Sequence, residues 1–142
     1  MQFDDAGRRR LEALERLGFM FDRAPSFMAL LRGPEHVFEI ANPAYLDIVG
    51  DRPIIGLSVA DALPDAAAQG YVDILDRVYE SGLPYRTSGS RFRQQRNPDG
   101  PIVDLYLDFV FQPMVDENGK VEGIFVDCLL YTSDAADDSL RV

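Results

Sequence analysis

Cysteine and histidine are scarce in this chain of 142 residues, which contains one of each and no tryptophan. A single cysteine cannot form an internal disulfide, so we expect a protein of a reducing compartment, the cytoplasm. The single histidine, His36, has no second histidine or nearby cysteine with which to form a common zinc site. We interpret it as an exposed structural residue beside a turn.

Positive charge is also scarce, because 14 Lys and Arg residues stand against 24 Asp and Glu residues, a net charge of -10. Contacts with phosphate groups need clustered basic side chains, so the composition argues against binding to nucleic acid. No apolar run approaches the roughly 20 residues that a membrane-spanning helix needs, and we expect no membrane segment in this chain. A hydrophobic content of 46% with 27% charged residues predicts a globular domain.

The N-terminal segment predicts an amphipathic helix that ends before Pro25, because proline interrupts helical hydrogen bonding. Leu11, Leu14 and Leu17 recur among charged residues at a spacing that places them on one helix face. This face must pack against the rest of the chain or against a second copy. We therefore take the three leucines as candidate dimerisation residues, although the pattern covers too few turns to predict a coiled coil.

Two further helices have clear signals. Asn42 can cap a helix that has Pro43 in its first turn and ends at Gly50. The main helix follows after residue 65, ends at Gly82, and carries apolar residues at the i, i+3, i+4, i+7 spacing. Its inward-facing residues are predicted to be Tyr71, Ile74, Leu75 and Val78.

Strands are predicted where apolar and polar residues alternate. Two short strands flank the turn "RGPE", and in the second strand Phe38 and Ile40 should both face inward because Glu39 separates them. The clearest strand has apolar residues at every second position, and Asn118-Gly119 predicts the hairpin that follows it. The inward residues of that strand are Leu105, Leu107, Phe109 and Phe111. The order of elements predicts an α+β fold with helices on one face of an antiparallel sheet.

Three segments in this order resemble a PAS domain, the sensory module of bacterial histidine kinases and related signalling proteins. They are "VFEIANPAYLDIVG", "IIGLSVADALPD" and "FQPMVDENGKVEGIFV". The resemblance covers residues 20–127, after an N-terminal helix at 1–19. It implies a five-stranded antiparallel sheet, helices packed on one face, and a cavity between them.

The resemblance also bears on cofactors and ligands. The reactive-cysteine motif of flavin photosensors in this family is missing, and the main helix has no histidine to hold haem, so we expect neither cofactor. A small ligand could occupy the cavity, unless side chains fill the core completely. The candidate lining residues, from the pattern of inward positions, are Phe38, Ile40, Tyr45, Ile74, Val78, Phe92, Phe109 and Phe111.

The C-terminal segment begins with "CLLYTSDAADD" and resembles the translation of a transposon-end sequencing adapter. We therefore expect residues 128–142 to be a non-native tail, and the natural protein to continue after residue 127. In the PAS family, the last strand leads into a linker that carries the signal to an output domain.

These observations predict a non-catalytic sensory and dimerisation module, a fragment of a larger bacterial signalling protein such as a histidine kinase. It would form a homodimer and bind a small ligand or a partner protein. Two other interpretations remain open at this stage. One is an interaction scaffold with a filled core, and the other is a small α+β enzyme, which would need converging titratable groups in a pocket.

Overall fold

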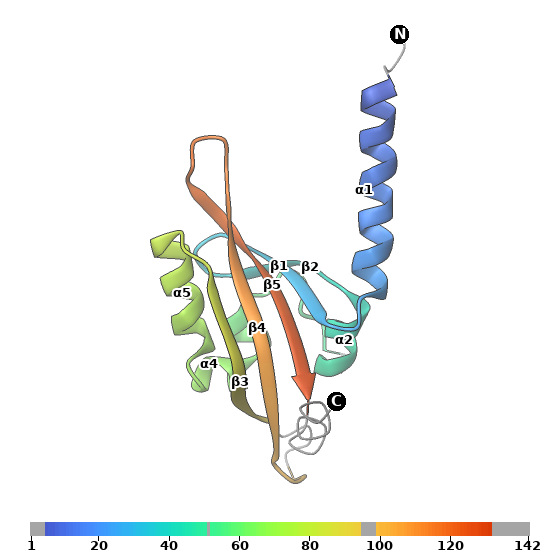
Figure 1. The fold of residues 1–142 in the computed structure, drawn as a ribbon. Helices are drawn as coiled ribbons and strands as arrows, with labels where there is room; N and C mark the ends of the chain where they lie inside the picture. The colour runs from blue at the N-terminus through green and yellow to red at the C-terminus, as the bar shows by residue number, and fades with distance from the viewer. Residues whose placement is uncertain (1–4, 51, 95–98, 132–142) are drawn as a thin grey trace.

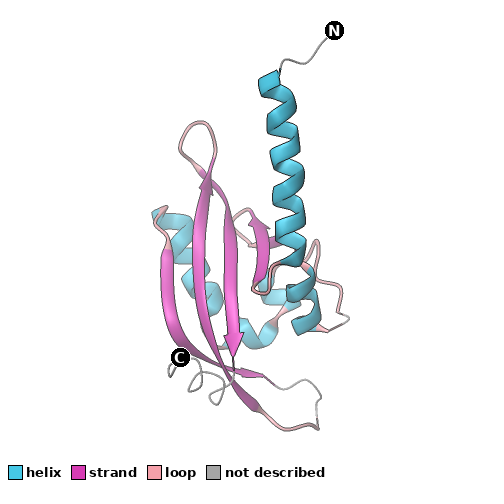
Figure 2. Cartoon of the chain, turned by 45° about the vertical axis from the view of Figure 1, so that its right-hand side comes forward, coloured by secondary structure: helices cyan, strands magenta, loops and turns pink. Residues whose placement is uncertain are grey.

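The computed structural model describes residues 5–50, 52–94 and 99–131 of the chain (Figure 1). One sheet of five strands forms the centre of the domain. The helices that follow its second strand in sequence lie against one of its faces, as Figure 1 and Figure 2 show. The elements in chain order are α1 (Asp5–Arg23), β1 (Phe27–Arg32), β2 (Val37–Ala41), α2 (Pro43–Val49), α3 (Val59–Ala62), α4 (Pro64–Ala68), α5 (Tyr71–Ser81), β3 (Tyr85–Gln94), β4 (Val103–Val115) and β5 (Val121–Tyr131).

The strand order is β2-β1-β5-β4-β3, and every neighbouring pair is antiparallel. The last strand in sequence therefore lies in the middle of the sheet, between the first strand and β4. Strand β4 has the predicted alternation, since Leu105, Phe109 and Phe111 are buried against the helices while Asp104 and Gln112 are exposed. The predicted α+β architecture is confirmed.

The inward orientation predicted for Ile40 is wrong, because β2 contains a bulge. Leu31 pairs with Phe38 while its neighbour Leu30 pairs with Ile40, so Glu39 is an extra residue on β2. An extra residue interrupts the two-residue alternation of a strand and moves the side chains that follow to the opposite face. Phe38 is buried, with 1% of its surface exposed, whereas Ile40 is 42% exposed. Ala41 returns to the core side opposite Ala29.

The interpretation of His36 as an exposed residue is also wrong, because only 1% of its surface is exposed. Its backbone has a φ of 57°, a left-handed conformation that turns the chain into β2. The imidazole Nε2 lies 2.7 Å from Oδ1 of Asp76 on α5, and the ring packs edge-on against Tyr79. A partner 40 residues away buries this histidine, and nothing in its local sequence indicates that partner.

Helix α1 projects from the domain, with its C-terminal end close to α2 (Figure 1). None of its described residues is buried, and Leu11, Leu14 and Leu17 are 53%, 54% and 58% exposed. The helix ends at Arg23, four residues beyond the boundary placed at residue 19. Within the described residues, no helix is both long and apolar enough to span a bilayer.

The predicted non-native tail begins inside β5. Cys128 pairs with Phe27 of β1 and with Phe109 of β4, and the strand continues to Tyr131. Residues 132–142 lie outside the described part of the chain.

Candidate functional site

A cavity of about 110 Å³ lies between the sheet and the helices, so side chains do not fill the core completely. Helices α2, α3, α4 and α5 contribute to one wall, and strands β1, β3, β4 and β5 form the other. The aromatic rings in its wall are those of Phe27, Tyr45, Tyr71, Phe92, Phe109 and Phe111. A largely apolar cavity with few polar groups is typical of small-molecule sites.

Half of the predicted lining residues lie in the wall of this cavity: Tyr45, Phe92, Phe109 and Phe111. Phe38 and Val78 are buried in the core outside the wall, Ile74 packs against the core, and Ile40 faces the opposite side of the sheet. The prediction missed Phe27 and Tyr71. The helical periodicity had placed Tyr71 inward, but no sequence signal separates an inward residue that packs from one that lines a void. The role of all these residues in ligand binding stays a prediction.

Ring contacts hold two groups of aromatic side chains in place. Tyr71 lies edge-on to Phe92 and Phe109, with 5.7 Å between the ring centroids in each pair. On the other side, Tyr45 contacts Phe27 at 5.8 Å and Phe38 at 5.5 Å, also edge-on. Such contacts fix ring orientations, so the wall of the cavity is largely preformed.

Polar contacts fasten α4 and α5 to the edge strand β3. The Tyr71 hydroxyl lies 2.9 Å from Ser90 Oγ and donates to the carbonyl oxygen of Arg91 at 3.2 Å. The Gln69 carboxamide exchanges two hydrogen bonds of 2.8 Å with the backbone of Arg93. Burial raises the pKa of Tyr71, and the hydrogen bond with Ser90 partly offsets that rise. These contacts join the helices to β3 beside the cavity and occupy the Tyr71 hydroxyl as both donor and acceptor.

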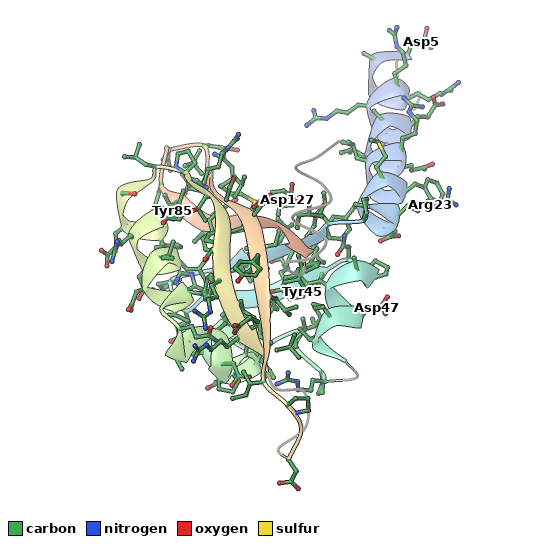
Figure 3. The ribbon with its side chains drawn as sticks, turned by 60° about the horizontal axis from the view of Figure 1, so that its bottom comes forward. Asp5, Arg23, Tyr45, Asp47, Tyr85 and Asp127 are labelled. Carbon is green, nitrogen blue, oxygen red and sulfur yellow. The ribbon has the colours of Figure 1, made fainter. Side chains whose placement is uncertain are left out.

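The Tyr45 hydroxyl has no hydrogen-bond partner among the described residues, although Tyr45 lines the cavity. Figure 3 shows Tyr45 between α2 and the sheet. Burial raises its pKa strongly, and the neighbouring Cys128 thiol adds to the rise, so the hydroxyl keeps its proton at neutral pH. The pKa of Cys128 itself is raised to about 12, chiefly by burial and secondarily by Asp127. A phenol hydroxyl in a cavity wall without a protein partner is a natural contact point for a ligand.

Asn42 positions Tyr45 in the cavity wall. Its Oδ1 accepts hydrogen bonds from the backbone N–H groups of Tyr45 (3.1 Å) and Met28 (3.0 Å). Its Nδ2 donates to the carbonyl oxygens of Phe21 at 3.1 Å and Ser26 at 2.9 Å. The side chain is fully buried. One carboxamide thus caps α2, as predicted, and also joins α2 to the end of α1 and the start of β1.

Charged side chains occur in the described cavity wall only at Arg52 and Asp65, and both residues are exposed to solvent. Asp65 is thus the one carboxylate in this described wall, and His36 lies outside it. In the part of the chain that the structure covers, no three His, Cys, Asp or Glu side chains gather in a way that could hold a metal ion. The described wall therefore does not bring together the converging titratable groups that acid–base catalysis uses.

No family model matches the sequence. Solved structures match the fold. An RNA-binding light-oxygen-voltage receptor is 16% identical, with a TM-score of 0.68, and the match covers 97% of this chain and 38% of that one. VqmA of Vibrio cholerae, in a structure described as bound to DPO, is 24% identical with a TM-score of 0.61, covering 83% and 57%. The PAS domain of Bordetella pertussis BvgS is 23% identical with a TM-score of 0.57, covering 92% and 93%.

These similarities show that the chain has the fold of PAS domains, as predicted from the three sequence segments. The chain spans less than two thirds of the length of the light-oxygen-voltage receptor and VqmA chains.

Proposed function

We propose that this chain is a non-catalytic sensory module whose cavity binds a small molecule and whose state controls an attached output domain. The observation that carries the proposal is the preformed cavity of about 110 Å³ with its aromatic wall. An empty apolar void destabilises a protein, because the atoms around it lack contacts. A ligand that fills the void restores those contacts, so the fold gains stability when it binds.

The matched structures support this proposal by their descriptions. VqmA is described as bound to DPO and as a dimer, and a sensory box sensor histidine kinase of Vibrio cholerae shares the fold at a TM-score of 0.54. We extend ligand binding and a signalling output, such as a histidine kinase, to this chain as proposals. The cavity volume suits a small molecule better than a porphyrin or a flavin ring system, which supports the expectation that neither is the ligand.

A second copy of the chain is the proposed partner of α1. The leucine stripe of Leu11, Leu14 and Leu17 is exposed on a helix whose described residues are all unburied. Pairing of two such helices would remove this surface from water, which is the usual driving force for association. The same stripe favours the second candidate function, an interaction scaffold that acts through α1 alone.

The proposed route to the output domain is β5. This strand lies in the middle of the sheet, and Val126 lines the cavity while Asp127 is paired with Val110. A ligand that shifts β5 would shift whatever follows residue 127 in the natural protein. Because residues 128–142 resemble an adapter translation, we propose that a native linker replaces them, and sequencing of the uninterrupted gene tests this.

The sensory proposal is tested by ligand-detected and protein-detected NMR with a broad library of small fragments. We expect several fragments to shift resonances of cavity residues such as Leu75 and Val126. A matched control is Ala66→Leu, which fills the cavity from α4. The variant should lose these shifts and unfold at a higher temperature than the parent chain. If no fragment of the library binds the parent chain, the sensory proposal is wrong and the scaffold interpretation gains support.

A further inference from the structure

Resting on the proposed function, we propose a chemical class for the ligand. It is a small, uncharged molecule with one flat ring, a short substituent and a hydrogen-bond acceptor that receives the Tyr45 hydroxyl proton. The inference uses the volume of the cavity, the aromatic rings in its wall, the position of its charged residues and the hydrogen bonding of its tyrosine hydroxyls.

The size follows from the cavity volume of about 110 Å³. An engineered protein cavity of about 150 Å³, lined by aliphatic and aromatic side chains, stays dry and binds benzene. The present cavity is of the same order and is not fully enclosed, since the exposed residues Arg52 and Asp65 belong to its wall. One six-membered ring with a short substituent is therefore the appropriate size.

The flat shape follows from the rings in the wall. Phe109 and Phe111 lie side by side with centroids 4.5 Å apart, and Tyr71 and Tyr45 present their rings from α5 and α2. Aromatic rings pack well against another ring in edge-on or offset arrangements. A flat ring can contact rings from the helices on one side and from the sheet on the other.

The ligand is expected to carry no formal charge, because the inner part of the described wall offers no opposite charge. The charged lining residues among those described, Arg52 and Asp65, both reach solvent and stay hydrated there. An ionised ligand placed deeper would lose its hydration without gaining an opposite charge, which is strongly unfavourable. A carboxylate or ammonium group on the ring is therefore disfavoured.

The hydrogen-bond acceptor on the ligand is inferred from how the hydroxyls of the two cavity tyrosines are hydrogen-bonded. The Tyr71 hydroxyl is occupied by Ser90 and the Arg91 carbonyl oxygen, whereas the Tyr45 hydroxyl has no partner among the described residues. A hydroxyl in an apolar wall that lacks a protein partner gains a hydrogen bond when the ligand offers an acceptor. A carbonyl oxygen or ring nitrogen on the ligand would provide it, and a ligand without an acceptor would leave the hydroxyl unsatisfied.

The test compares three ligands with the same number of non-hydrogen atoms: acetophenone, α-methylstyrene and benzoate. Acetophenone carries the acceptor, α-methylstyrene has the same shape without it, and benzoate adds the charge. Titration calorimetry at pH 7 should find that the affinity of acetophenone relative to that of α-methylstyrene is about three- to ten-fold higher for the parent chain than for Tyr45→Phe, the value of one hydrogen bond. Benzoate should bind more weakly than both.

Tyr45→Phe removes only the hydroxyl and keeps the ring that packs on Phe27 and Phe38. In this variant acetophenone should bind about three- to ten-fold more weakly than in the parent chain, while the affinity of α-methylstyrene should not change. Tyr79→Phe is the matched control, because Tyr79 packs against His36 outside the cavity wall. It should leave both affinities unchanged.

Two results would overturn the proposed ligand class while leaving the sensory proposal intact. One is tighter binding of benzoate than of acetophenone, and the other is a ratio of acetophenone to α-methylstyrene affinity that is the same in the parent chain and in Tyr45→Phe. Binding that survives Ala66→Leu would place the ligands outside the cavity and would also overturn the class. Failure of these ligands together with the whole fragment library would instead contradict the proposed function itself.

Discussion

The imidazole Nε2 of His36 lies 2.7 Å from the Oδ1 atom of Asp76, and this contact joins the turn before β2 to the middle of α5. A carboxylate only accepts hydrogen bonds, so Nε2 carries the proton and donates. The other ring nitrogen, Nδ1, is buried without a partner among the described residues. The Nε2 contact is therefore the side-chain hydrogen bond that holds the ring in the core.

We predict that Asp76→Ala lowers the free energy of unfolding by about 1 to 2 kcal/mol. The substitution leaves a buried Nε2–H without an acceptor, and partial exposure of the Asp76 side chain reduces the effect. Urea unfolding followed by circular dichroism measures the change. Asp73→Ala, an exposed carboxylate in the first turn of the same helix, should change stability by less than about 0.5 kcal/mol. Equal effects of the two variants would contradict the role assigned to the contact.

Asn42→Ala should be more damaging, with a loss of roughly 3 kcal/mol of stability. It removes an N-cap and leaves backbone groups of Met28, Phe21 and Ser26 without their side-chain partner in a buried region. Ser58→Ala is the matched control, because Ser58 Oγ caps α3 by accepting a single exposed hydrogen bond of 3.2 Å from the Asp61 N–H group. We expect a loss of about 1 kcal/mol there. Thermal unfolding should show the same order, and a reversed order would exclude Asn42 as the principal junction.

Replacing Leu11, Leu14 and Leu17 together by serine should convert a dimer into a monomer. The substitutions remove the exposed apolar stripe from α1 and leave the core unchanged, since none of these residues is buried. Multi-angle light scattering after size-exclusion chromatography measures the molar mass. Arg16→Ser, on the opposite side of the helix, should leave the mass of the dimer unchanged. A parent chain that is monomeric at high concentration would contradict the proposal that α1 pairs with a second copy.

Alkaline pH should destabilise the chain through Cys128. The thiol has a pKa of about 12 in the folded protein against 9.0 for an unperturbed thiol, so the unfolded chain loses its proton first as pH rises. The stabilising contribution is therefore complete below pH 9 and is lost progressively between pH 9 and about 12. Urea unfolding at several pH values from 8 to about 10.5 should show a shallower decline for Cys128→Ala than for the parent chain.

An independent check uses the reactivity of the same thiol. A buried thiol with a raised pKa reacts slowly because the thiolate is the nucleophile. At pH 8, a disulfide reagent should modify Cys128 rapidly in urea and slowly in the native protein. Equal rates in the two conditions would show that the thiol is accessible and would contradict its burial.

The local sequence was enough to determine the main helices and strands, the sides that they bury and the fold. The spacing of Tyr71, Leu75 and Val78 was enough to predict the buried side of α5, and the alternation along β4 was enough to predict which residues face the helices. Asn42 was recognised as a cap because capping depends on residues within one turn. The PAS fold was predicted from three short segments because their order reflects the order of elements around one sheet.

Only the tertiary structure decided the orientation and burial of side chains whose contacts come from residues far away in the sequence. The bulge at Glu39 turned Ile40 away from the core because β2 must match the register of β1, which local alternation does not encode. His36 became buried because Asp76 approaches it from a helix 40 residues later. Only the packed arrangement of helices on the sheet separates Tyr45, which lines the cavity, from Phe38, which packs beside it. A void is a property of how side chains meet in space, so sequence periodicity can identify the inward residues but cannot say which of them face empty space.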